Sequence, residues 1–246
     1  MPLLRTGDLD LYHQVVGEGD PLVLVHGSWS DHTSWQPAIE VGTRRKDEDD
    51  LEALIERLGP APAHVAGSSI GGSIALGLAA RRPELFRSIT VHEPPLVAIV
   101  ADDSDALGQL RPTRASMDPV LAHLGKGEYR QGARQFVEEV AVGPGTWDRL
   151  PAAVRETFVH NAPTWLDEQS DPDWAKIDTD ALARCAAPVL LSGGTQSPVW
   201  SATILDRPAA VLPRARRQTV EGAGHIPHVI HPRRYAAALT RFVRTS

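Results

Sequence analysis

The chain has 246 residues, of which 42% are hydrophobic and 23% charged, and its formal net charge is −6. This size and composition fit one globular α/β domain, and an acidic chain without a basic stripe argues against a nucleic-acid partner. The lone Cys185 excludes a disulfide framework. No apolar run approaches the roughly 20 residues of a membrane-spanning helix, and the first residues turn polar too early for a signal peptide. We therefore expect a cytoplasmic protein with no membrane partner.

The first part of the chain predicts strands followed by a helix. Residues 9–16 alternate between apolar and polar side chains and end at a Gly-rich turn. Leu22–Val25 is a continuous apolar run ending at His26-Gly27, and such runs are typical of strands buried in a parallel sheet. Residues 50–58 have helical spacing and stop at Gly59-Pro60.

The next segment predicts a serine on a turn between a strand and a helix. Gly67-Ser68-Ser69-Ile70-Gly71 follows the apolar run 64–66 and precedes the small-residue run 72–80. In this context the turn strains the backbone and exposes the serine hydroxyl. Ser69 has glycine two residues before and two residues after it, whereas Ser68 does not. Ser69 is therefore the candidate nucleophile.

The remainder of the chain predicts a sheet interrupted by helices. A strand over 88–91 carries His92-Glu93-Pro94-Pro95 at its carboxyl end. From 96 to 184 the strands are replaced by three or four amphipathic helices, including stretches over 129–140 and 151–161. Further strands are predicted over 188–191 and 217–220, and a helix over 235–243. This pattern predicts an α/β core over 1–95 and 185–246, with a helical cap over 96–184.

Three motifs in this order resemble the α/β-hydrolase superfamily over nearly the whole chain. They are Val23-Leu24-Val25-His26-Gly27, the turn at Ser69, and Gly224-His225. The resemblance implies a mostly parallel central sheet with helices on both faces, the α/β-hydrolase fold, and a cap inserted into it. It also implies that Ser69 is the nucleophile and His225 the general base. The motifs are specific for the fold and much less so for a substrate.

The carboxylate that usually completes this set departs from the family's pattern. After the strand ending at Leu191 the sequence is Gly193-Gly194-Thr195-Gln196-Ser197-Pro198, with no acid. Some members, among them zearalenone-type lactonases, take the acid from the strand after the turn. Their local pattern is similar to His92-Glu93-Pro94, and to His225 followed by His231-Pro232. The resemblance therefore implies that Glu93 is the acid; a structural role for Glu93, or an acid from the cap, stays open.

A second departure lies between Trp35-Gln36-Pro37 and the helix predicted from residue 50. The family usually places a further helix and strand there, and this strand would lie beside Leu22–Val25. Its loss would leave backbone groups unpaired inside the sheet. The sequence therefore predicts either a segment omitted across residues 39–45 or a true deletion that weakens the fold or its activity.

The three residues have distinct expected roles. A serine hydroxyl attacks only as a base removes its proton, which His225 would do while Glu93 holds the other ring nitrogen. The oxyanion would be bound by the backbone N–H of Ile70 and by a second donor. That donor is expected in the loop that begins at Gly27, from Ser28 or from Trp29.

We predict a serine hydrolase that cleaves an ester or lactone of an apolar or aromatic small molecule through an acyl-enzyme on Ser69. A zearalenone-like lactone is the specific substrate candidate. The predicted substrate-binding residues are Trp29, Leu96, Phe136, Phe158 and Trp165. A carbon–carbon bond hydrolase and a ligand-binding member without turnover are the alternatives, whereas a serine nucleophile argues against dehalogenase and epoxide hydrolase chemistry.

No cofactor and no metal are expected. His225, His228 and His231 lie close in the sequence, but Pro227 and Pro232 interrupt their spacing and break regular ligand geometry. A homodimer is left open.

Overall fold

The computed structural model describes residues 3–6, 9–13, 22–29, 44–58 and 61–246. Every structural statement below refers to these residues. The expected omission or deletion across residues 39–45 falls largely outside them, as do Trp35-Gln36-Pro37.

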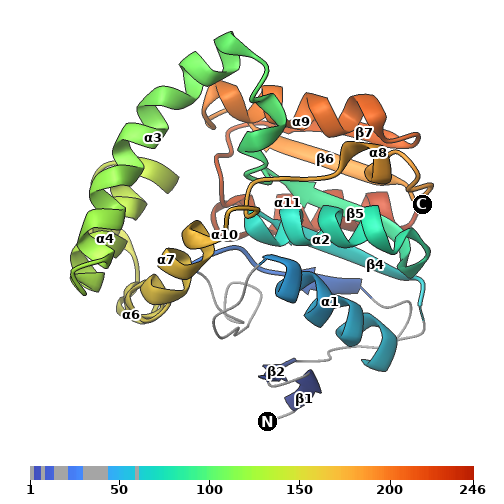
Figure 1. The fold of residues 1–246 in the computed structure, drawn as a ribbon, viewed down its shortest axis with the longest axis horizontal. Coiled ribbons are helices and arrows are strands. Elements are labelled where there is room, and N and C mark those ends of the chain that lie inside the picture. The colour runs from blue at the N-terminus through green and yellow to red at the C-terminus, as the bar shows by residue number, and fades with distance from the viewer. Residues whose placement is uncertain (1–2, 7–8, 14–21, 30–43, 59–60) are drawn as a thin grey trace.

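A five-stranded sheet lies at the centre of the molecule (Figure 1). Its strands, in spatial order, are β3 (Leu22–Val25), β4 (Ala63–Ser68), β5 (Phe86–His92), β6 (Val189–Gly194) and β7 (Ala215–Val220). All neighbouring pairs are parallel, so their carboxyl ends lie at one edge. β1 (Leu3–Thr6) and β2 (Leu9–Tyr12) form a separate antiparallel pair. The predicted fold class is confirmed.

The helices are numbered in chain order. Their bounds are α1 (Arg44–Leu58), α2 (Ile70–Arg81), α3 (Ser104–Leu124), α4 (Tyr129–Gln135), α5 (Thr146–Arg149), α6 (Ala152–His160), α7 (Ala162–Ser170), α8 (Thr179–Leu182), α9 (Val199–Val211), α10 (Pro227–Ile230) and α11 (Pro232–Val243). Short 3₁₀ turns cover Pro83–Leu85 and Val97–Val100, and Phe136–Ala141 is a π-helix. None of the described helices combines the length and apolar character needed to cross a membrane.

Helices cover both faces of the sheet. Val65 of β4 packs in the main core with Ile74 of α2, whereas its neighbour Ala66 packs with Tyr235 and Leu239 of α11. Successive residues of a strand point to opposite faces, so α2 and α11 lie on opposite sides of β4. The main core also includes residues of α1 and α9.

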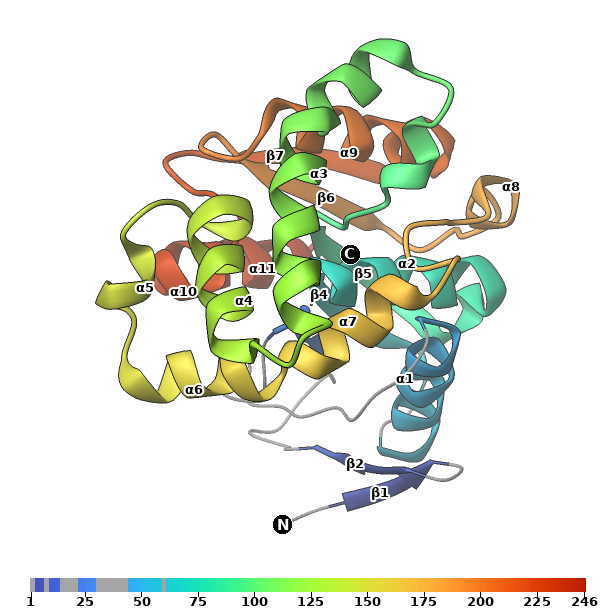
Figure 2. The same ribbon diagram turned by 60° about the vertical axis from the view of Figure 1, so that its left-hand side comes forward.

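Between β5 and β6 the described chain is helical. Figures 1 and 2 show α3, α4, α6 and α7 packed together to one side of the sheet. A second apolar cluster, separate from the core on the sheet, joins these helices to the loop after β3. The assignment of this segment as a cap domain over 96–184 stays a prediction.

Several predicted boundaries are wrong. The helix expected over 50–58 begins at Arg44, because its first turns are held by ion pairs of Arg44 with Glu48 (3.2 Å) and Arg45 with Asp49 (3.5 Å). The helix expected over 129–140 divides into α4 and the π-helix. Helix α9 was not predicted, although Pro198 directly before it is a recognisable start signal.

β3 is the last strand of the sheet in the described part of the chain. It pairs with β4 along one side, and the side chains of Leu22 and Leu24 are 40% and 41% exposed. The described residues contain no strand on its other side, where the sequence predicts that the family's usual strand would lie.

Candidate active site

Ser69 occupies a strained turn between β4 and α2. Its φ and ψ are 54° and −127°, in the left-handed half of backbone space that side chains usually avoid. A Cβ at Gly67 would lie 2.3 Å from the Gly71 carbonyl oxygen, and one at Gly71 would lie 2.3 Å from the His26 carbonyl oxygen. Glycine is therefore required at both places for the turn to close, as the sequence predicts.

Two further residues share this strain. Among the described residues other than glycine, a positive φ occurs at Trp29 (64°), Ser69 (54°) and Glu93 (47°). Each follows the carboxyl end of a strand, and the three strands β3, β4 and β5 are neighbours in the sheet. Strain of this kind persists where the surroundings hold it, and it collects at functional sites. This edge of the sheet is therefore the candidate active site.

Glu93 and His225 are brought together from β5 and from the loop after β7. His225 Nδ1 donates to Glu93 Oε2 at 2.9 Å, and the backbone N–H of Gly194 donates to Glu93 Oε1 at 2.8 Å. A carboxylate can only accept here, so the proton lies on Nδ1 and the Nε2 lone pair is free. His225 can thus accept a proton through Nε2 while Glu93 orients the ring.

Glu93 is the ionised partner of this pair. Its side chain is buried, which by itself raises its pKa, but the hydrogen bond from His225 and the nearby His225 and His92 lower the pKa to about 2. The folded protein therefore keeps this carboxylate charged at any ordinary pH.

Glycines at the end of β6 leave room for the Glu93 side chain. A Cβ at Gly194 would lie 2.1 Å from the Ala223 carbonyl oxygen, so only glycine fits at this position. A Cβ at Gly193 would lie 3.5 Å from Glu93 Oε1. Glu93 reaches across the end of β6 and uses the Gly194 N–H as a donor.

The loop after β3 passes directly against the nucleophile. A Cβ at Gly27 would lie 2.9 Å from Ser69 Cβ, so this close approach needs glycine. Ile70 begins α2, and the first N–H groups of a helix have no partner within it. The predicted oxyanion loop and the Ile70 N–H therefore flank Ser69. No hydrogen bond joins the Ser69 hydroxyl to His225 in the described chain, and such contacts often tighten only with substrate.

Ser28 has a partner that the sequence does not reveal. Its hydroxyl donates to Glu168 Oε2 of α7 at 2.5 Å, so its backbone N–H is the group left for an oxyanion. Burial, together with the neighbouring Asp47 and Asp171, raises the pKa of Glu168 to about 8, although the hydrogen bond from Ser28 opposes the rise. No local pattern links positions 28 and 168, and we found no sequence signal for this contact.

Four of the five predicted substrate-binding residues form one aromatic cluster. The Trp29 ring stacks on Phe136 at 4.7 Å and lies 5.1 Å from Trp165 and 6.2 Å from Phe158. Trp29 is 1% exposed, and its buried Nε1 has no hydrogen-bond partner among the residues that the structure describes. Leu96 lies apart, fully buried in the core on the sheet.

A buried histidine lies beside Glu93 and the residue before His225. His92 Nε2 is 3.2 Å from the Gly224 carbonyl oxygen and Nδ1 is 3.0 Å from Ser192 Oγ. The carbonyl can only accept, so Nε2 carries the proton, while the Ser192 hydroxyl donates to the Val91 carbonyl oxygen at 3.0 Å. His92 thereby ties the residue before His225 to β6, a contact that the sequence analysis did not find.

His92 makes the stability of the protein depend on pH. Burial lowers the pKa of His92 from 6.5 to about 4, so below pH 6.5 the unfolded chain binds a proton that the folded chain does not. The contribution of His92 to the free energy of unfolding is therefore expected to fall as the pH falls from 6.5 to 4. For this one group the loss at pH 5 is about 2 kcal/mol. Burial lowers the pKa of His228 to about 4 as well, so it adds a loss of the same sign.

Urea unfolding at pH 7.5 and at pH 5.0 measures this difference. The His92→Gln variant should lose about 2 kcal/mol less than the wild type between the two pH values, whereas a His160→Gln variant at an exposed position should behave as the wild type does. An equal change in the free energy of unfolding between the two pH values in all three proteins would contradict this role of His92.

Comparisons with known proteins identify the family and the fold. A family model described as alpha/beta hydrolase fold matches residues 27–232. The pimeloyl-(acyl-carrier protein) methyl ester esterase of Chromobacterium violaceum is 28% identical over 263 aligned positions, covering 96% of this chain and 99% of that protein. The enol-lactonase of Burkholderia xenovorans LB400 aligns with a TM-score of 0.77 and 16% identity over 99% of this chain and 100% of its own. Est816, an N-acyl homoserine lactone degrading enzyme, aligns with a TM-score of 0.69 and 19% identity over 98% of this chain and 100% of its own. At these identities the solved structures show a shared fold alone.

Proposed function

The chain belongs to the alpha/beta hydrolase fold family as an ester-hydrolysing member, and we propose that it acts as a serine hydrolase through Ser69, His225 and Glu93. The observation that carries the proposal is the hydrogen bond between Glu93 and His225. It lies at the sheet edge where the strained turn presents Ser69. A protein that only bound its ligand would need neither an oriented histidine nor a strained serine.

In the proposed reaction the Ser69 hydroxyl attacks the carbonyl carbon of an ester or lactone. His225 Nε2 takes the hydroxyl proton, and Glu93 stabilises the imidazolium through Nδ1–H. The negative oxygen of the tetrahedral intermediate is bound by the N–H of Ile70 and by one from the loop that begins at Gly27. His225 then returns its proton to the leaving alkoxide, which leaves an acyl-enzyme.

Water completes the cycle by the same route. His225 removes a proton from the water as it attacks the acyl carbon, and the proton passes to Ser69 as the acid is released. No bound cofactor is needed for either step. With a lactone, the alcohol and the acid are two ends of one opened product.

The substrate that we propose is a small molecule with an apolar or aromatic part. The cluster of Trp29, Phe136, Phe158 and Trp165 adjoins the loop that contacts Ser69. Phe136 and Phe158 are only half-buried and offer aromatic surface, while Trp29 and Trp165 are buried and support them. Two of the similar proteins act, by their names, on a methyl ester and on a lactone. A zearalenone-like lactone remains the specific candidate to include in a screen.

Covalent labelling tests this proposal without knowledge of the substrate. A fluorophosphonate probe forms a stable adduct with an activated serine, and intact-mass analysis detects it. The wild type and a Ser68→Ala variant, in which the serine next to Ser69 is removed, are expected to gain one adduct, and Ser69→Ala none. Circular dichroism confirms that each variant is folded. An unlabelled wild type, or a labelled Ser69→Ala variant, would contradict the proposed nucleophile and favour a ligand-binding role.

A further inference from the structure

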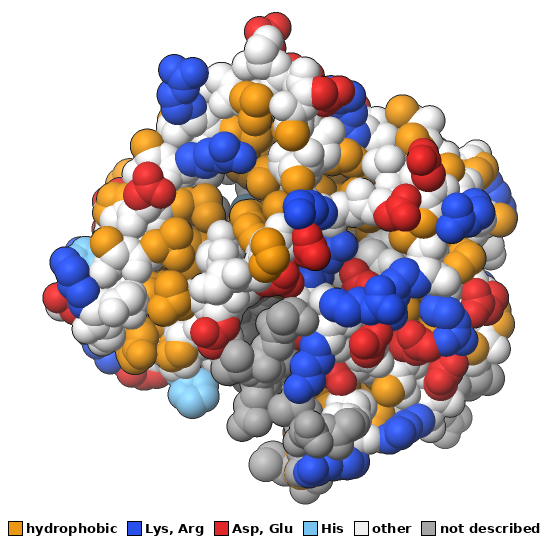
Figure 3. Space-filling model, viewed as in Figure 1, with side chains coloured by type: hydrophobic (Ala, Val, Ile, Leu, Met, Phe, Trp, Pro, Cys, Tyr) orange, Lys and Arg blue, Asp and Glu red, His pale blue; other side chains and the backbone are white. Residues whose placement is uncertain are grey.

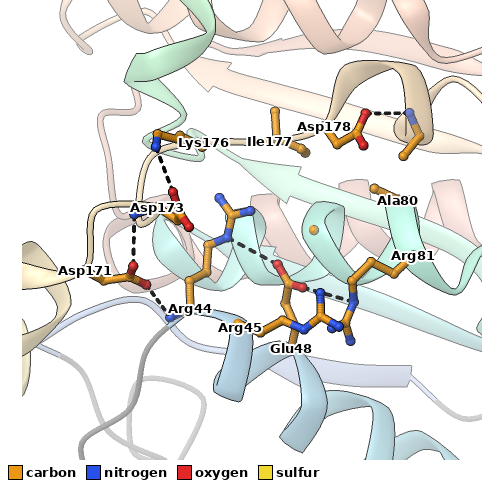
Figure 4. A pocket seen from close by; sticks show the side chains of 12 residues that line it. Arg44, Arg45, Glu48, Ala80, Arg81, Asp171, Asp173, Lys176, Ile177 and Asp178 are labelled. Carbon is orange, nitrogen blue, oxygen red and sulfur yellow. Dashed lines mark hydrogen bonds and ion pairs between the residues drawn. The ribbon is translucent and has the colours of Figure 1, made fainter.

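A polar cavity lies between α1, α2 and residues 171–181, and none of its lining residues belongs to the candidate active site. Its volume is about 500 Å³, within the range of small-molecule sites. Figure 3 shows basic and acidic side chains gathered over this part of the surface. Figure 4 shows Arg44, from the first turn of α1, with its guanidinium group pointing into the space between the three elements.

The carboxylates of the 171–181 segment already have donors. Asp171 accepts from the backbone N–H of Arg44 at 3.0 Å and from that of Asp173 at 2.9 Å. Asp173 pairs with Lys176 at 2.8 Å, and Asp178 accepts from the N–H of Ala181 at 2.8 Å. These acids are therefore engaged with their own segment and with the start of α1.

Glu48 lies buried between two arginines. Its carboxylate is 3.2 Å from Arg44 Nε and 3.3 Å from Arg81 Nε. A Cβ at Gly77 would lie 1.9 Å from Glu48 Oε1, so glycine in α2 makes room for the carboxylate. Arg81 also reaches Asp49 and Glu52 through Nη2. Arg44 and Arg81 both pair with Glu48, and Arg44 makes no other side-chain ion pair in the described chain.

The unused hydrogen-bonding capacity of this cavity consists of donors. Arg44 Nη1 and Arg81 Nη1 are buried without a hydrogen-bond partner, and no acceptor of the lining residues in the described chain is left in that state. A buried charged donor without an acceptor is unfavourable. The missing partner must therefore supply oxygen atoms, and the positive charge of the guanidinium selects an anion.

We propose that this cavity is a binding site for a small oxyanion, a carboxylate or a phosphate, held by the outer edge of the Arg44 guanidinium group. Its two terminal nitrogens form a planar fork that matches two oxygens of such a group. Arg81 and Lys176 also line the cavity, but their charges are paired with acids, so Arg44 is the group to which the site is assigned. The limited volume points to a small metabolite rather than to a polymer.

Isothermal titration calorimetry with inorganic phosphate and, separately, with acetate tests the site. Each titration is run against sodium chloride of equal ionic strength, so that general screening is subtracted. Saturable binding of at least one anion is expected in the wild type, at least tenfold weaker in Arg44→Gln, and weakened in Arg44→Lys because one ammonium cannot form the fork. The anion that binds more tightly distinguishes phosphate from carboxylate recognition.

Arg45→Gln is the matched control, because Arg45 is the next residue of α1 and its side chain is 69% exposed. It should bind as the wild type does. If the Arg44 variants do not fold, phenylglyoxal modification of the wild type replaces them. Peptide mapping should then show Arg44 protected by the bound anion. The proposal is overturned if neither anion gives saturable binding, if Arg44→Gln binds as tightly as the wild type, or if Arg44 is not protected.

Discussion

The Ser69→Ala variant is expected to lose roughly 10⁴- to 10⁶-fold of the wild-type kcat/KM on an activated aryl ester. The methyl group that remains cannot form the acyl-enzyme, so only binding and the oxyanion donors can still assist direct attack by water. Initial rates with a chromogenic p-nitrophenyl ester, at protein concentrations checked by mass, measure this loss.

Ser68→Ala is the matched control. Ser68 is the last residue of β4, and its side chain is buried. It precedes Ser69 directly, so both variants alter the same turn by one oxygen atom. We expect Ser68→Ala to keep activity within about tenfold of the wild type, because Ser68 is given no chemical role. Comparable activity in Ser69→Ala and the wild type would contradict the proposed acyl-enzyme mechanism.

The Glu93→Gln variant is expected to lose about 10³- to 10⁴-fold in kcat, with little change in KM. The amide has nearly the shape of the carboxylate, but it carries no charge to stabilise the imidazolium. Its NH₂ group can also face His225 Nδ1, which favours the ring form with the proton on Nε2. That form cannot accept the proton from Ser69. Steady-state kinetics across pH 6–9 measure the loss.

Glu84→Gln supplies the control for this change. Glu84 is exposed and pairs with Arg82, so its loss should leave kcat unchanged. The pKa of about 2 also predicts that protonation of Glu93 plays no part in any loss of activity between pH 4 and 7. A loss below tenfold in Glu93→Gln would show that another acid serves His225.

The parts of the site that the sequence predicts are those fixed by strand order. Ser69, Glu93 and His225 each follow a strand, and parallel strands bring their carboxyl ends to one edge. The hydrogen bond between Glu93 and His225 follows from this placement, because β6 ends in glycines that leave room for Glu93. The proximity of Glu93 and His225 could thus be predicted from the sequence, and the role of Glu93 as the acid stays a proposal.

The contacts that could not be predicted depend on how the helices after β5 pack. Glu168 reaches Ser28, and Phe136 stacks on Trp29, across more than a hundred residues of chain. Hydrophobic periodicity indicates which face of a helix is buried, but not the element that it meets. The early start of α1 was missed for a different reason. Its first turns are polar, and their ion pairs with residues four positions later became evident only in the structure.

The positive φ angles of Trp29, Ser69 and Glu93 imply a conflict between durability and catalysis. Each such residue is less stable than glycine would be in the same backbone by about 1 to 3 kcal/mol, a large part of the 5 to 15 kcal/mol that usually holds a domain together. Laboratory evolution that selected only for heat resistance would therefore gain stability from glycine at Ser69, whereas Trp29 also fills the second apolar cluster and would be kept. A thermostable variant obtained in this way would keep the sheet and lose the enzyme, so any such selection has to screen for turnover as well.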